Sequence, residues 1–156
     1  MRPRDASRKQ LAVPSIADSE RAMRIREVFA DLADLNEEVP VIVEGKRDAE
    51  ALREMGLSGE VITYNRGLGV HEFCDEIHAR YAKCVLLMDW DGVGESLMSK
   101  LGPELGGMWE EFTNYRRLLK AMCQREVKDI EGIPGLIRKL ELHSPPLSGQ
   151  SDVRLR

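Results

Sequence analysis

The chain has 156 residues, of which 42% are hydrophobic and 32% charged, an ordinary composition for one globular domain. Its net charge of −4 argues against a protein that coats nucleic acid non-specifically, because such binding depends on Lys and Arg; local basic patches stay compatible with it. No apolar run could span a bilayer, no signal-peptide pattern is present, and the three cysteines lack C-x-x-C spacing. We therefore expect a cytoplasmic protein with no membrane partner.

Apolar periodicity predicts alternating helices and strands. A helix capped by Asp18 or Ser19 is expected to run to about residue 36. Strands are expected at 39–44, 60–64 and 84–88, with a short fourth strand near 108–112. Further helices are expected at 47–55, 70–81, 94–101, 114–125 and 134–142. The alternation predicts an α/β fold, with a parallel sheet of about four strands covered by helices on both faces.

Three regions are expected along the chain. Residues 1–37 read as a basic arm followed by the N-terminal helix. Residues 38–132 form the α/β domain, and residues 133–156 a C-terminal helix with a flexible tail.

The first acidic signature follows the predicted strand at 39–44. Glu44 ends the apolar run, Gly45 allows a sharp turn, and Asp48 is placed to cap the next helix. That leaves Glu44 free at the edge of the sheet. An isolated Glu at the end of a strand is usually only a solvated residue, so a functional role for Glu44 depends on a second acidic signature.

The second signature, Asp89-x-Asp91-x-x-Gly94, follows the predicted strand at 84–88. Alternate residues that leave a strand can point the same way, so Asp89 and Asp91 can share a metal ion. Glu95 is a further candidate ligand, although a Glu in the first turn of a helix is equally well explained by the helix dipole.

Both signatures are expected at one crevice, because ligands of open α/β sheets bind outside the carboxyl ends of the strands. Glu44, Asp89 and Asp91 would repel one another there unless a cation lies among them. Oxygen ligands suit a hard ion such as Mg²⁺.

These motifs resemble the Toprim domain of topoisomerases, bacterial-type primases, OLD-family nucleases and a ribosomal RNA maturation nuclease. The resemblance covers about residues 38–132 and is closest to small stand-alone prokaryotic Toprim proteins, on residues 41–53 (VIVEGKRDAEALR), 86–91 (LLMDWD) and 125–132 (REVKDIEG). It implies a Rossmann-like sheet and phosphoryl transfer that depends on Mg²⁺, with Mn²⁺ as an alternative ion. Asp89 and Asp91 would hold the metal, and Glu44 would be a general acid/base or a further ligand.

One departure from the Toprim pattern concerns substrate phosphate. Many members have Arg directly after the second Asp, where this chain has Gly92. Lys46 or Arg47 would then replace that contact. A basic stretch on the helix at 114–125, which includes Arg116, Arg117 and Lys120, is either a solvated face or a surface that follows phosphates.

The resemblance favours nuclease-like phosphodiester chemistry on RNA or DNA. A different hypothesis is a non-catalytic, metal-binding module that acts with a partner protein in DNA or RNA metabolism. The motif Asp-x-Asp-Gly-Val also opens phosphatases of the haloacid dehalogenase type. These enzymes need a downstream Lys and an acidic pair after another strand, for which this chain offers few candidates, Asp129 and Glu131.

Overall fold

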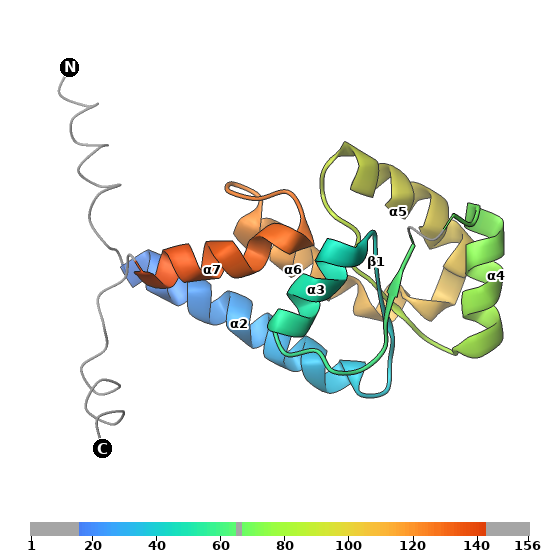
Figure 1. Cartoon of the computed structure of the whole chain (residues 1–156), viewed down its shortest axis with the longest axis horizontal. Helices are drawn as coiled ribbons and strands as arrows, with labels where there is room; N and C mark the ends of the chain where they lie inside the picture. Colours follow the sequence, from blue (N-terminus) through green and yellow to red (C-terminus); the bar gives the residue numbers. More distant parts are fainter. Residues whose placement is uncertain (1–15, 65–66, 143–156) are drawn as a thin grey trace.

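The structure is a computed structural model that describes residues 16–64 and 67–142. The predicted basic arm and flexible tail lie outside these ranges. Figure 1 shows the elements, which in chain order are α2 (Ile16–Asn36), β1 (Val41–Val43), α3 (Lys46–Glu54), β2 (Val61–Thr63), α4 (Val70–Arg80), β3 (Val85–Leu86), α5 (Gly92–Leu105), the 3₁₀ turns η1 (Gly106–Met108) and η2 (Glu110–Phe112), α6 (Thr113–Cys123), the 3₁₀ turn η3 (Ile130–Gly132) and α7 (Ile133–Leu142).

The sheet within the described residues has three strands, all parallel, in the order β2-β1-β3. Val41 of the central strand pairs with Val61 on one side and with Val85 on the other. All three residues of β1 are buried, as expected for a strand that has helices on both faces. The fold is therefore α/β, as the alternation predicts, but it is mostly helical and its sheet is smaller than expected.

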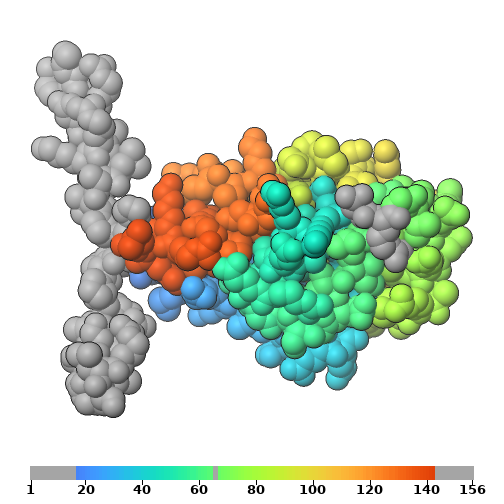
Figure 2. Space-filling view, viewed as in Figure 1, coloured from blue at the N-terminus to red at the C-terminus, as the bar shows by residue number. Residues whose placement is uncertain are grey.

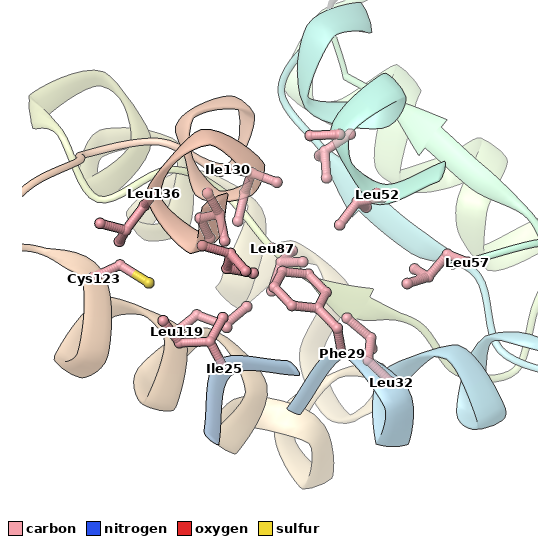
Figure 3. Close-up of a cluster of buried hydrophobic side chains, with 14 of the residues drawn as sticks. Ile25, Phe29, Leu32, Leu52, Leu57, Leu87, Leu119, Cys123, Ile130 and Leu136 are labelled. Carbon is pink, nitrogen blue, oxygen red and sulfur yellow. The ribbon is translucent and has the colours of Figure 1, made fainter. Parts of the chain in front are cut away.

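One face of the sheet packs on α2, α3, α6 and α7. Side chains of β1 and β3 that point to this face meet residues from each helix, and Figure 3 shows the centre of the cluster around Phe29, Leu52 and Leu87. Phe29 is 1% exposed and Leu87 is fully buried. α2 and α7 lie side by side at one end of the molecule (Figure 1).

The other face packs on α4 and α5. Because side chains alternate along a strand, Ile42 and Leu86 point away from the first cluster and contact Phe73 of α4 and Leu101 of α5. α4 forms the end of the molecule opposite α2 and α7 in the space-filling view (Figure 2). Helices thus cover both faces, as predicted.

The predicted fourth strand near 108–112 is wrong. This segment forms the 3₁₀ turns η1 and η2, after Gly106 ends α5 with a φ of 55°. It still lies beside the sheet, since the carbonyl oxygen of Met108 accepts a hydrogen bond from Cys84 N at 3.1 Å.

Two helix boundaries also differ from the prediction. α2 begins at Ile16, so Asp18 and Ser19 both lie inside the helix and neither is its N-cap. α5 begins earlier than predicted, at Gly92, because Asp91 caps it, and it ends later than predicted, at Leu105. Of the helices described, none is both long and apolar enough to cross a membrane.

Candidate functional site

The two acidic signatures meet at the carboxyl ends of neighbouring strands. Glu44 directly follows β1, and Asp89 follows β3, which pairs with β1. The chain leaves β1 through α3 toward β2, and it leaves β3 into α5. β2 and β3 lie on opposite sides of β1, so the crevice between β1 and β3 is the topological switch point where α/β folds bind ligands.

Glu44 lies against the backbone of the second signature. Its Oε2 accepts a hydrogen bond from Asp89 N at 3.3 Å. Burial raises the pKa of Glu44 above its ordinary value, and the negative charge of Asp91 raises it further. The carboxyl group is thus half-buried among other acids, which makes its charged form costly.

Asp89 is 6% exposed and lies deeper than Glu44. Its Oδ1 accepts a hydrogen bond of 2.8 Å from Ile130 N, which comes from the distant turn η3. Burial raises the pKa of Asp89 to about 8, the Ile130 N–H opposes that rise, and the charges of Asp48 and Glu44 add to it.

Asp91 is close to this pair but has a structural role that differs from the predicted one. Its Oδ1 accepts a hydrogen bond from Gly94 N at 2.7 Å and so caps α5. The backbone turns into the helix at Gly92, so Asp89 and Asp91 do not alternate along a continuing strand as expected. The charge of Asp91 still acts on Glu44.

Gly94 allows the first turn of α5 to approach the acidic residues. A Cβ built on it would lie 1.9 Å from the carbonyl oxygen of Asp89 and 2.9 Å from Oε2 of Glu44. A glycine at position 94 therefore relieves crowding at the start of the helix.

Asp48 is a further carboxylate at the site, which the sequence analysis treated only as a helix cap. Its Oδ2 accepts a hydrogen bond from Gly45 N at 3.3 Å, the expected capping role. Its Oδ1 accepts another from Glu131 N at 3.0 Å, so the side chain also holds the turn η3. Burial raises the pKa of Asp48. No sequence signal joins Asp48 to Glu131, since 83 positions separate them.

Glu95 forms ion pairs with two cationic side chains of α6. Its Oε2 lies 2.9 Å from Lys120 Nζ and 3.2 Å from Arg116 Nη2. The hydrogen bond from Lys120 lowers the pKa of Glu95, in contrast to the raised values of Glu44 and Asp89. The structure therefore separates this candidate ligand from the other acids and pairs it with two of the predicted phosphate contacts.

The predicted phosphate contacts fall into two groups. Lys46 and Arg47 are exposed in the first turn of α3, and Arg47 lies 3.8 Å from Glu131. Arg116 is 13% exposed, and its guanidinium donates to the carbonyl oxygens of Met88 and Asp89, each at 2.7 Å. Arg116 therefore does not belong to a solvated face; it fixes the backbone that carries Asp89.

A cavity of about 570 Å³ opens at the site. Its wall combines carboxylates with apolar side chains and the Gly45 turn: Glu44, Gly45, Asp48, Tyr64, Gly67, Leu68, Asp89, Val93, Leu97 and Glu131. Across residues 16–64 and 67–142, no group of three or more His, Cys, Asp or Glu side chains is arranged to hold a metal ion. Among the predicted site residues, Glu44 and Asp89 lie close together, whereas the side chain of Asp91 is bonded to the first turn of α5.

Comparison with known proteins identifies the relatives of this chain. A UPF0292 protein of Thermococcus gammatolerans is 34% identical, over 84% of this chain and 97% of that protein. One of Methanosarcina acetivorans is 30% identical, over 77% of this chain and 84% of that protein. The chain belongs to the UPF0292 family. A UPF0292 protein of Thermoplasma volcanium is 38% identical over 73 residues, which are 47% of this chain and 61% of that protein.

A solved structure shares the fold of this UPF0292 chain. It is described as a putative protein from Aquifex aeolicus, and it is 28% identical with a TM-score of 0.55. The match covers 67% of this chain and 94% of the Aquifex chain. No protein-family model matches the sequence.

The side chains at the strand ends have chemistry that suits cation binding and proton transfer. Glu44 and Asp89 supply oxygen donors, which hard divalent ions prefer. Their raised pKa values reflect charges that are poorly solvated and mutually repulsive, and a bound cation would relieve both costs. A carboxyl group whose pKa lies nearer to neutrality is also a better general acid or base.

Proposed function

We propose that this UPF0292 protein is a stand-alone Toprim domain, over residues 38–132, that performs Mg²⁺-dependent phosphodiester chemistry on RNA or DNA. One observation carries the proposal. Glu44 and Asp89 follow two adjacent parallel strands, meet at the topological switch point, and line one open cavity. Pairs of carboxylates with perturbed pKa values in a cleft are typical of functional sites.

The residues fit a divalent cation by their chemistry. Glu44 and Asp89 would hold it, and Asp91 would contribute the oxygen that does not cap α5. A bound Mg²⁺ or Mn²⁺ would polarise a phosphoryl oxygen and orient the attacking oxygen. Glu95 is left out of this set because Lys120 and Arg116 neutralise it.

The protein's own groups have separate roles in this proposal. Glu44 is less buried than Asp89 and lines the cavity, where it would serve either as a ligand of the ion or, when it does not coordinate the ion, as the acid/base that accepts or releases a proton. The N–H groups of Ile130 and of Gly94 hold Asp89 and Asp91 in place. Lys46 and Arg47 follow Gly45, which lines the cavity, and both are exposed; from there they would contact substrate phosphates.

The test is cleavage of end-labelled single- and double-stranded RNA and DNA with Mg²⁺, Mn²⁺ or chelator. We expect metal-dependent cutting by the wild type. The cleavage rate should fall at least about a hundredfold in Glu44→Gln and in Asp89→Asn, since each substitution removes a carboxylate of the reacting site. Asp75→Asn is the matched control, because Asp75 is exposed on α4 and does not line the cavity. Cutting that survives both site variants would refute the assignment.

A partner-dependent, non-catalytic module is the second candidate. The observation that favours it is the geometry of the third acid, since Asp91 is engaged as a helix cap and is thereby less available for catalysis. Calorimetry distinguishes the two candidates. Mg²⁺ binding that is lost in Asp89→Asn, together with no cleavage of any substrate, would support the module and contradict the nuclease.

A further inference from the structure

A second cavity, of about 280 Å³, lies where α5 meets α6 and has no described lining residue in common with the carboxylate cavity. Its apolar part is formed by Leu86 of β3, Met98 of α5 and Trp109. Its polar part comes from α6 and consists of Thr113, Arg116, Arg117 and Lys120. The cavity therefore combines an aromatic surface with three cationic side chains.

The charge at this cavity favours an anion. Within the part of the chain that the structure describes, the carboxylate paired with these cations is Glu95, at 3.2 Å from Arg116 and 2.9 Å from Lys120. Arg117 contacts the neutral side chain of Asn114. Three cations against one carboxylate make the cavity locally positive, on a chain whose net charge is −4. A dianionic group such as a phosphate would complete this balance.

The three cations differ in how free they are to meet a ligand. Arg116 is 13% exposed and is held by the carbonyl oxygens of Met88 and Asp89. It supplies a fixed positive charge behind the cavity. Arg117 is exposed and the Lys120 side chain is 39% exposed, so these two can turn to a phosphate.

The indole of Trp109 is held in one position. Its Nε1 donates to the carbonyl oxygen of Gly102 at 2.9 Å, and a Cβ on Gly102 would lie 3.0 Å from the ring. The ring therefore packs closely on α5 and stays partly exposed at the cavity. A fixed, partly exposed indole beside cations is a suitable surface for stacking a nucleobase.

We propose that the cavity between α5 and α6 binds a nucleoside phosphate, with the base on Trp109 and the phosphate on Arg117 and Lys120. The ligand is a free nucleotide or a nucleotide within a single strand, which share this chemistry. The proposal goes beyond the proposed function, because this binding needs neither a metal ion nor the carboxylates of Glu44 and Asp89.

The experiment is a titration followed by tryptophan fluorescence in the presence of chelator. Trp109 reports binding, since Trp90, the other tryptophan, is 7% exposed and its Nε1 is bonded to Val127 O. The probes are AMP, UMP, adenosine, inorganic phosphate and a short single-stranded oligonucleotide. We expect saturable binding of a mononucleotide or of the oligonucleotide, weaker binding of adenosine and of phosphate alone, and the same affinities in Glu44→Gln.

The double variant Arg117→Gln, Lys120→Gln is expected to weaken that binding by at least about tenfold, because two charged contacts to phosphate are lost. Lys100→Gln is the matched control, an exposed cation of α5 that does not line the cavity. Circular dichroism checks that each variant folds. Equal affinity in the double variant, or phosphate bound as tightly as AMP, would overturn the proposal, and so would the lack of saturable binding by any nucleotide probe.

Discussion

Gly94 offers the sharpest test of the site, because α5 approaches Asp89 there without room for a side chain. In Gly94→Ala, the Cβ would start 1.9 Å from the carbonyl oxygen of Asp89, while an ordinary contact begins at 3.4 Å. The helix and the strand end must therefore separate by about 1.5 Å. The obstacle is backbone, which cannot rotate away as a flexible side chain would.

The magnitude follows from two opposing effects. Overpacking of this kind costs about 3 kcal/mol, and alanine returns up to about 1 kcal/mol of helix propensity relative to glycine. We expect a net loss of about 2 kcal/mol in the free energy of unfolding. The same shift moves Asp89 from Glu44, so Mg²⁺ affinity should fall at least about tenfold.

Gly92→Ala is the matched control, because Gly92 lies in the same first turn and a Cβ there meets nothing within 4 Å. It should be neutral or stabilising by up to about 0.5 kcal/mol. Urea unfolding measures stability, and calorimetry measures Mg²⁺ affinity. If Gly94→Ala and Gly92→Ala unfold with the same free energy, α5 does not approach Asp89 as described and the geometry of the site is wrong.

Two further predictions concern the scaffold. Asn36 is 1% exposed and bonds to Val39 O, Glu60 O and Gly59 N, so Asn36→Ala should cost about 2–4 kcal/mol in urea unfolding, against almost no change for the exposed Asn114→Ala. The hydrogen bond from Arg21 lowers the pKa of Glu126, so this pair stabilises the fold above the ordinary Glu pKa and that contribution is lost as the pH falls through the lowered value. Glu126→Gln should therefore lower the free energy of unfolding by about 0.5–1 kcal/mol at pH 7 and leave it nearly unchanged at pH 3; an equal loss at both pH values would contradict this account.

The sequence predicts the central acidic pair well, for a simple physical reason. A buried parallel strand is a short apolar run, and a charged residue can appear only where that run leaves the core. Glu44 and Asp89 mark the ends of two such runs, and adjacent parallel strands bring their carboxyl ends together. Helix positions follow similarly from apolar spacing, so most predicted helices agree with the structure to within a few residues.

The rest of the site depends on contacts that local patterns do not encode. Asp91 was expected to continue the alternation of a strand, but the chain has already turned into α5; the Asp before a helical stretch was the available signal for a cap. Arg116 lies off the apolar stripe of its helix, and its long side chain reaches carbonyl groups 27 and 28 positions away. The turn η3, which supplies donors to Asp89 and Asp48, comes from more than 40 positions beyond Asp89.

Buried carboxyl groups lower the stability of the fold, and this loss of stability favours a functional role for the acidic residues at this edge of the sheet. Asp89 is almost fully buried beside Glu44, and burial raises its pKa to about 8. At neutral pH the unfolded chain carries this group as a carboxylate, so folding must either bury that charge or take up a proton, and both lower the stability. A neutral Asn could accept the same hydrogen bond from Ile130 N without that cost. Stability alone therefore does not explain a carboxyl group here. The proposed cation between Asp89 and Glu44 would explain it, because the ion would replace the proton of Asp89 and offset the repulsion between the two carboxylates.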